Sequence, residues 1–301
     1  MDPSDKYNLI YEFINSYDEM KTKLDKYKIK IKLHNNHYLI KYYNKEDLEY
    51  YNNFLKCFRG MIINKETNKI VCYGLDGKTN DFKTNNNFND ITIEESIDGT
   101  LINLYYDNDK WYISTKGCSN AIKSFYQLFI DAWSNYYDNF DILNKDYCYS
   151  FVLMHPNNQI VTYYDKEDIR LLQIRDMTNF NIINDNHLDI DKPKTLDLIC
   201  DDYNKLEELV NNLSYELEGF MLYSKDKNNR IKMINSKYTN VKNLKGNYRK
   251  ILFRLVDLYY NDQNKLDELL NYFPFYKNNL DKFLYIKKRF ISMLFYLYNK
   301  T

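Results

Sequence analysis

The stretch IEESIDGTLINLYY, residues 93–106, carries an Asp-Gly pair between two runs that read as β-strands. The runs at 90–96 and 99–109 are rich in Ile, Leu, Thr and Tyr, and their pattern predicts strands. An Asp-Gly pair between strands commonly forms a tight hairpin turn. A hairpin is therefore the simplest interpretation of Asp98 and Gly99, unless the rest of the chain places this segment in a site.

Strand-like runs surround this stretch and give way to helices near the C-terminus. Turn residues separate further runs that predict strands over 37–43, 57–64, 69–74, 110–117, 147–156, 159–165, 169–176, 215–225 and 229–238. Apolar residues at helical spacing predict helices over 5–30, 120–140, 206–214, 248–260, 263–273 and 279–300. The strand signals stop after about residue 245, so we expect an α+β body with antiparallel sheets, followed by an all-helical domain.

The composition is that of a folded chain without an overall charge. Of the 301 residues, 44% are hydrophobic and 17% aromatic, which allows a sizeable core. Lys and Arg total 42, as do Asp and Glu, so any nucleic-acid site must be a local basic patch. The many Asn, Lys and Tyr residues indicate an AT-rich coding genome, as in some large DNA viruses, protists or low-GC bacteria.

The five cysteines and the apolar segments bear on the compartment. The cysteines are scattered without a Cys-x-x-Cys pair, which argues against a zinc ribbon and fits a reducing environment. Residues 1–13 lack the basic and apolar regions of a signal peptide. The longest apolar stretch, residues 290–298, is too short to cross a bilayer and predicts a buried helix. These features predict an intracellular, cytoplasmic protein with no membrane partner.

Several segments resemble, in order along the chain, the nucleotidyltransferase motifs of the ATP-dependent RNA ligases, most of all the T4 RNA ligase 1 family. They are CFRGMIIN (57–64), IEESIDGTLINLYY (93–106), WYISTKG (111–117), YSFVLMHPNNQIV (149–161), LEGFMLY (217–223) and RIKMINSKY (230–238). The resemblance covers about residues 50–245. No single segment is specific, since Asp-Gly and Glu-Gly pairs are common, and the order and spacing of the set carry the resemblance.

The resemblance implies a fold and a reaction. It implies an ATP-grasp-like nucleotidyltransferase domain over residues 1–245 and a helical C-terminal domain over 246–301. In that family a lysine amine attacks the α-phosphate of ATP, and the resulting lysyl-AMP passes AMP to an RNA 5′-phosphate. A 3′-hydroxyl then displaces AMP. The resemblance thus implies ATP and Mg²⁺ as cofactors and RNA as a partner.

This chain departs from the family pattern at positions that matter for the reaction. Ser96 stands at the position of the nucleophilic lysine, and a serine hydroxyl needs an adjacent general base to attack. Val152 replaces a glutamate, Ile234 replaces the second lysine of the Lys-x-Lys motif, and Gln159 replaces an arginine. Losing several such groups together indicates loss of the ligase reaction.

Other motif residues are kept. The resemblance assigns nucleotide binding to Arg59, Asp98, Gly99, Lys116, Glu218, Gly219 and Lys232. It also makes Glu218 a candidate metal ligand, since carboxylates suit Mg²⁺. If the resemblance is real, Ser96, Lys116, Glu218 and Lys232 should converge on one cleft, with Arg59 at its rim.

Three functions stay open on the sequence alone. The first is an RNA ligase-like protein, defective in lysyl-AMP formation, that binds a nucleotide, an RNA end or a protein partner in the former active-site cleft. The second is an active, divergent ATP-dependent RNA ligase or nucleotidyltransferase that uses another lysine, such as Lys78 or Lys83 in the upstream loop. The third is a structural or host-interaction protein without nucleotide function.

Overall fold

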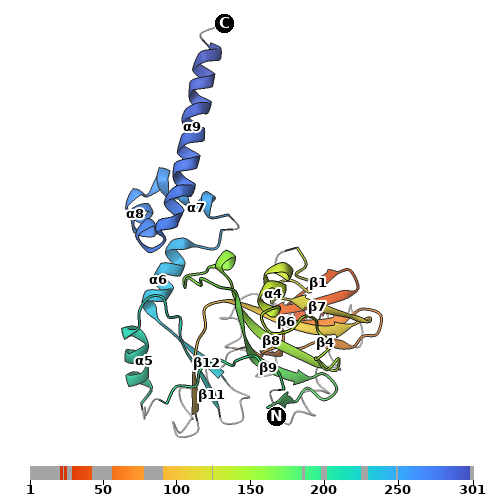
Figure 1. Cartoon of the computed structure of the whole chain (residues 1–301). Coiled ribbons are helices and arrows are strands. Elements are labelled where there is room, and N and C mark those ends of the chain that lie inside the picture. Colours follow the sequence, from red (N-terminus) through yellow and green to blue (C-terminus); the bar gives the residue numbers. More distant parts are fainter. Residues whose placement is uncertain are drawn as a thin grey trace.

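Antiparallel sheets form the body of the molecule, and a helical region rises from it (Figure 1). The structure is a computed structural model. It describes residues 21–22, 24–25, 29–42, 56–77, 91–123, 125–184, 187–197, 202–224, 230–248 and 250–298. The loop containing Lys78 and Lys83 lies outside the described residues, as does most of the helix predicted over 5–30.

Twelve strands are assigned within the described residues, in three sheets. The four-stranded sheet runs in the order β1 (Ile29–His34), β2 (His37–Tyr42), β3 (Arg59–Asn64) and β4 (Ile70–Cys72). The five-stranded sheet runs in the order β10 (Ile182–Ile183), β9 (Asp168–Asp176), β8 (Tyr147–Met154), β6 (Thr100–Asp107) and β7 (Lys110–Ser114). The three-stranded sheet runs in the order β12 (Arg230–Ile234), β11 (Gly219–Ser224) and β5 (Ile91–Glu95).

The main core lies between the five-stranded sheet and helix α4 (Tyr126–Trp133). Strand β8 is buried over nearly its whole length, so both of its faces contact protein. Tyr149, Phe151 and Leu153 belong to the same apolar cluster as Phe129 and Trp133 of α4. The intervening residues of β8 face the other way, because side chains alternate along a strand.

The other face of the five-stranded sheet packs against the four-stranded sheet. Cys148 lies in one buried apolar cluster with Leu39, Ile62 and Tyr105. Next to this cluster, buried His37 of β2 contacts Asp107 of β6, with 2.7 Å between His37 Nε2 and Asp107 Oδ2. The two sheets are therefore held together by an apolar cluster and by the contact between His37 and Asp107.

The three-stranded sheet is apolar on one face and polar on the other. Phe220, Leu222, Ile231 and Met233 cluster with Leu206 of helix α5 (Tyr203–Asn212). The opposite face presents residues that pair across the strands in rows. One row is Lys232, Met221 and Glu94, and the next is Arg230, Tyr223 and Thr92. We call these two rows the polar face.

Residues 96–99 connect two sheets and are not a hairpin turn. Strand β5 belongs to the three-stranded sheet and β6 to the five-stranded sheet, so the chain crosses between them at this point. The simplest interpretation of Asp98 and Gly99 is therefore wrong. The connecting segment contacts both sheets: the Ser96 amide donates to the Gly219 carbonyl of β11 at 2.9 Å, and a Cβ atom on Gly99 would come within 2.5 Å of the Leu153 carbonyl oxygen of β8.

The prediction of a strand over residues 159–165 is also wrong. No strand is assigned there, although Ile160, Val161 and Thr162 favour strands. The amides of Val161 and Thr162 each donate to Asp98 Oδ2 at 2.8 Å and so pair with a side chain instead of a neighbouring strand. Val161 itself packs into the core of the helical region.

Helices follow the last strand. They are α6 (Ser236–Lys245), α7 (Ile251–Asn261), α8 (Gln263–Tyr272) and α9 (Lys277–Tyr298). Three of them confirm the predicted helical C-terminus, whereas α6 replaces the end of the strand predicted over 229–238. Asn235 starts α6, because its side chain accepts a hydrogen bond from the amide of Lys237 at 3.0 Å and caps the helix.

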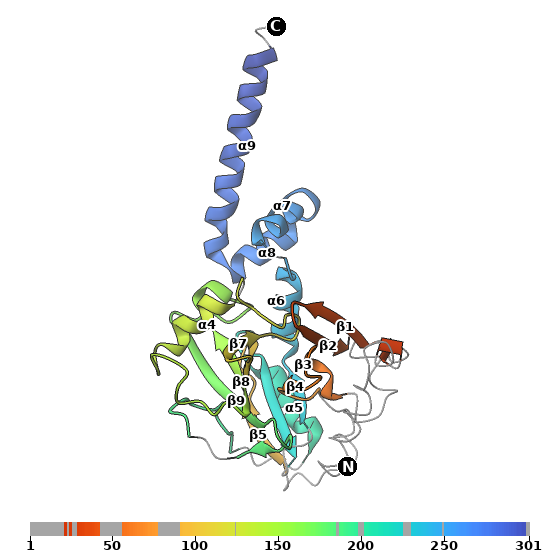
Figure 2. The same ribbon diagram turned by 90° about the vertical axis from the view of Figure 1, so that its right-hand side faces the viewer.

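Helix α6 shares an apolar core with α7–α9, and α9 then projects away from the rest of the molecule. Tyr238, Val241 and Leu244 of α6 cluster with apolar residues of the three later helices. The domain boundary at 245/246 stays a prediction, since α6 contributes to this helical core. In both views, α9 projects as a single long rod (Figure 2). The prediction of a buried helix over residues 290–298 is wrong, because large side chains there, such as Phe290 and Phe295, are more than half exposed. None of the described helices combines the length and apolarity needed to cross a membrane.

Candidate nucleotide site between the sheets

Ser96 lies against the end of strand β11. Its amide donates to the carbonyl oxygen of Gly219 at 2.9 Å, and its hydroxyl donates to Glu218 Oε2 at 3.0 Å. The side chain is buried, with 8% of the residue exposed. The candidate nucleophile position is therefore next to the Glu-Gly motif, 122 residues further along the chain.

Lys232 reaches the same carboxylate. Its amine forms an ion pair with Glu218 Oε2, the oxygen that also accepts from Ser96. Burial lowers the pKa of Lys232, and the charge of Glu218 opposes this shift. A second amine, Lys242 of α6, lies 4.0 Å from Glu218 Oε1. We call Ser96, Glu218 and Lys232 the serine–glutamate–lysine cluster.

Asp98 is next to this cluster and is fully engaged. Besides the amides of Val161 and Thr162, it accepts a hydrogen bond from the Tyr238 hydroxyl at 2.6 Å on Oδ1. Its backbone carbonyl accepts from the Tyr164 hydroxyl at 2.7 Å. Burial and the nearby carboxylates of Glu218 and Asp98 raise the pKa of Tyr238. Asp98 thus ties the sheet crossing to α6.

The backbone conformation at position 219 requires glycine. Its φ is +135°, and a Cβ atom there would lie 2.0 Å from the carbonyl oxygen of Met233. The amide of Asn235 donates to the carbonyl of Glu218 at 3.0 Å, which brings the end of β12 alongside. The Glu-Gly pair therefore turns the chain so that Glu218 points to Lys232.

Lys116 and Arg59 belong to a second group. The Lys116 amine lies over the Tyr42 ring, 4.2 Å from its centroid, and Gly60 lies close to the Lys116 backbone. Arg59 is hydrogen-bonded to the Tyr42 side chain. The convergence of Lys116 with the serine–glutamate–lysine cluster stays a prediction. Arg59 is close enough to Arg230 for their charges to interact. Arg230 lies two residues before Lys232 on the polar face.

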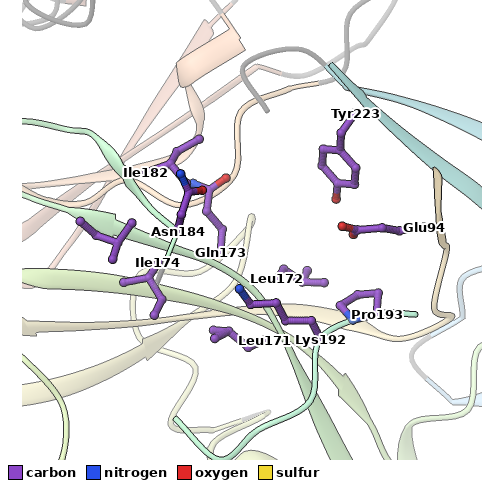
Figure 3. A pocket seen from close by; sticks show the side chains of 11 residues that line it. Glu94, Leu171, Leu172, Gln173, Ile174, Ile182, Asn184, Lys192, Pro193 and Tyr223 are labelled. Atoms are coloured by element: carbon purple, nitrogen blue, oxygen red, sulfur yellow. The ribbon is translucent and has the colours of Figure 1, made fainter. Parts of the chain in front are cut away.

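A hollow opens between the polar face and strands β9 and β10 (Figure 3). Its volume is about 520 Å³, including the space open to solvent. Glu94 and Tyr223 line it from the polar face, and Gln173 and Lys192 line it from the other side. The Nε2 atom of Gln173 is buried and has no hydrogen-bond partner among the described residues. The hollow thus combines apolar walls with polar groups suited to a ligand.

The residues that depart from the family pattern have their own structural roles. Val152 is buried, and a Cβ atom on Gly99 would come within 2.7 Å of its Cγ2 atom, so it fills the space beside the sheet crossing. Ile234 is 41% exposed at the end of β12. Gln159 donates to the carbonyl of Val161 at 3.0 Å. None of these groups supplies a charge to the serine–glutamate–lysine cluster.

Sequence reasoning missed some of the residues around the site. The motif pattern gives Tyr238 and Lys242 no role, because both lie on α6, a helix that the sequence does not predict. Lys245, also on α6, donates to the carbonyls of Gln159 and Ile160 at 2.5 and 2.8 Å. Burial lowers the pKa of Lys245 to about 8. The Asn235 cap was the one local signal for this helix.

Comparison with known proteins points to ligases. Over 97 residues the chain is 31% identical to the RNA ligase of Rhodothermus phage RM378, covering 27% of this chain and 22% of that protein. Over 243 residues it is 28% identical to a protein of Autographa californica nuclear polyhedrosis virus named as a bifunctional polynucleotide kinase/RNA ligase. That match covers 70% of this chain and 34% of the viral protein. No family model matches the sequence.

The fold agrees with these matches. An ATP-dependent DNA ligase, so named, from Aquifex aeolicus superposes with a TM-score of 0.52 at 17% identity, over 93% of this chain and 78% of that one. In sequence the chain is thus similar to RNA ligases of viruses, and its fold is that of an ATP-dependent ligase. The chain spans about a fifth and a third of the length of the two curated relatives.

Proposed function

We propose that this chain binds a nucleotide or a phosphate-bearing RNA end between its sheets and forms no covalent bond to AMP at Ser96. One observation carries the proposal. At the nucleophile position stands a buried hydroxyl that already donates to Glu218, where the reaction needs an amine. The positively charged groups next to it remain, and they suit phosphate binding.

Ser96 is poorly equipped to replace a lysine. It carries no charge to attract phosphates and needs a general base. Glu218 is at the right distance, but the oxygen that faces Ser96 is already paired with the Lys232 ammonium. An AMP ester on serine would also be a poorer donor of AMP than a phosphoramidate.

A second candidate function is an active ligase whose nucleophile is Lys232. This candidate is favoured by one observation, namely that the Lys232 amine shares Glu218 Oε2 with Ser96 and so lies beside the nucleophile position. The lowered pKa of Lys232 would make its amine easier to deprotonate. Glu218 would accept the proton, a P–N bond to the α-phosphate of ATP would form, and pyrophosphate would leave.

Labelling separates these functions. The protein is incubated with α-labelled ATP and Mg²⁺ and analysed by denaturing electrophoresis. We expect no label on the wild type. Ser96→Lys should restore little labelling, because Val152 and Ile234 remain. Lys232→Arg and, as matched control, Lys237→Arg on α6 are tested in parallel.

An acid-labile label on a lysine of the wild type would overturn the proposal. If that label disappears in Lys232→Arg and persists in Lys237→Arg, the second candidate is established. If the label persists in both variants, another lysine is the nucleophile, such as Lys78 or Lys83.

Noncovalent binding is expected to be weak for ATP. The missing lysines and glutamate remove charge-assisted contacts worth about 1.5–3 kcal/mol each. Two such losses weaken ATP binding by about 100-fold or more, at roughly 1.4 kcal/mol per decade. RNA should bind better and lose affinity with salt, because its backbone can use other basic side chains such as Lys242.

Calorimetric titration at low and high salt checks this expectation. Lys116→Ala and Lys232→Ala should each weaken binding further. Tight, salt-insensitive binding of ATP would contradict it. If neither ATP nor RNA binds, and neither Lys116→Ala nor Lys232→Ala changes the titration, a structural or host-interaction protein would be favoured.

A divalent metal fits the site only together with a ligand. Among the described residues, no group of three His, Cys, Asp or Glu side chains could hold a metal ion. Glu218 offers Oε1, because Oε2 is taken by Ser96 and Lys232. Mg²⁺ is commonly bound by one or two carboxylates together with substrate phosphates. We therefore propose that Glu218 would contribute one oxygen to Mg²⁺ carried in with a nucleotide, whose charge the metal would neutralise.

A further inference from the structure

Three arginines from distant parts of the chain surround one aspartate. Arg59 begins β3, Arg175 lies near the end of β9, and Arg230 begins β12. Between them is Asp76, in the segment that follows β4. Arg175 Nη2 lies 3.7 Å from Asp76 Oδ2, and Arg230 Nε donates to the Asp76 carbonyl at 3.1 Å. We call these three arginines with Asp76 the arginine cluster.

Arg175 and Arg230 of the arginine cluster are buried, Arg59 is half-buried, and among the described residues the cluster carries excess positive charge. Arg175 and Arg230 are 4% and 8% exposed. Arg59 has its pKa lowered to about 10 by burial, and the neighbouring charge of Arg230 adds to the shift, yet it stays protonated at neutral pH. The acids that face these arginines are Asp76 and, across Tyr223, Glu94. Even with both acids counted, the positive charges outnumber the negative ones.

Two guanidinium nitrogens in the cluster lack partners. Arg59 Nη1 and Arg175 Nε are buried and have no hydrogen-bond partner among the described residues. A buried, unsatisfied donor on a charged group is costly, more so than a neutral one. Asp76 is not a partner of either nitrogen: its Oδ1 accepts from the Tyr73 hydroxyl at 2.6 Å, its carbonyl accepts from Arg230, and its Oδ2 lies 3.7 Å from Arg175 Nη2. The geometry is that of a site short of one anion.

We propose that Arg59, Arg175 and Arg230 form a binding site for a phosphate group, and that Asp76 partly fills it as an internal competitor. Guanidinium forks match the oxygens of phosphate in planar, bidentate geometry, and a phosphate dianion offsets the excess charge. The inference deepens the proposed function, on which it rests: it places the phosphate at the arginine cluster, whereas Lys232→Ala tests the serine–glutamate–lysine cluster separately.

The hollow provides a path to the site. Gln173 lines it and lies two residues before Arg175 on β9, so both side chains share a face of that strand. Tyr223 lines it as well and is paired with Arg230 across β11 and β12. A ligand in the hollow would therefore place a phosphate beside the arginine cluster once Asp76 gives way.

Titration calorimetry with inorganic pyrophosphate tests the proposal on the full chain. Arg175→Gln should weaken binding by 10-fold or more, equal to about 1.4 kcal/mol. Asp76→Asn should strengthen binding several-fold, because it removes the competing charge. The matched control is Arg254→Gln, which removes an arginine that pairs with Asp257 at 3.0 Å in α7 and should leave the affinity unchanged.

Further arms identify the source of the phosphate and guard against misfolding. A 5′-phosphorylated oligoribonucleotide is compared with its 5′-hydroxyl counterpart, and ATP with adenosine. Because Arg175→Gln could fail to fold, the thermal shift caused by pyrophosphate is also measured for Asp76→Asn, where it should exceed that of the wild type. No binding by the wild type, equal weakening in Arg254→Gln, or unchanged or weaker binding in Asp76→Asn would each overturn the proposal.

Discussion

Replacing Asp98 with alanine is expected to lower the free energy of unfolding by about 4 kcal/mol, measured by urea denaturation at neutral pH. The carboxylate accepts three hydrogen bonds, from the amides of Val161 and Thr162 and the hydroxyl of Tyr238. Each bond to a charged group is worth about 1.5–3 kcal/mol, and bonds that share an acceptor add less than fully. The loss also leaves all three donors without this acceptor.

A double-mutant cycle with Tyr238→Phe sharpens this prediction. Tyr238→Phe alone should cost about 1.5–3 kcal/mol, since it removes one bond to the carboxylate. Combined with Asp98→Ala it should cost clearly less than the sum, because both changes remove the same contact. Strict additivity of the two losses, or a cost of Asp98→Ala below about 1 kcal/mol, would show that Asp98 is not the tie between the sheet crossing and α6.

Gly219→Ala should be at least as damaging, with a loss above about 4 kcal/mol or no folded protein at all. The new Cβ atom would lie 2.0 Å from the Met233 carbonyl oxygen at a φ of +135°, so backbone atoms in β12 must move. That movement would separate Glu218 from Lys232 and open the pairing of β11 with β12. Circular dichroism and urea denaturation measure the effect.

Gly117→Ala is the matched control. A Cβ atom there would meet only the Lys41 amine, at 3.8 Å, and the residue is in an exposed turn. Its stability should change by less than about 1 kcal/mol. If both glycine substitutions are tolerated equally, the backbone at Gly219 can relax, and the turn is not what positions Glu218.

The sequence predicted most strands and the later helices because their signals are local. Strand β8 and helix α8 have the residue types and periodicity of their class. The segment 159–165 has a strand pattern too, yet its amides bond to Asp98, more than 60 residues away. A partner so distant leaves no trace in a local window, so tertiary contacts overrode propensity there.

In the candidate site, too, residues marked by a motif could be predicted, and residues brought together by long-range contacts could not. Ser96, Glu218 and Lys232 could be found from motif order, and the structure brings these three into contact. Arg175 and Arg230 had no motif to mark them, and their meeting with Asp76 depends on three strands from separate parts of the chain. The sequence also did not show that the Lys116 amine lies over the Tyr42 ring, because motif spacing does not tell where a side chain points.

The projecting helix α9 has a consequence for local stability. Leu280 at its base is buried in the helical core, whereas Ile286, Phe290 and Phe295 further along are each more than half exposed. The outer turns rely on their own backbone bonds, and a helix segment of that length is marginal in water without packing. Deuterium should therefore replace the amide hydrogens of the outer turns through fraying, long before those at the base, so one helix would show two levels of protection against exchange.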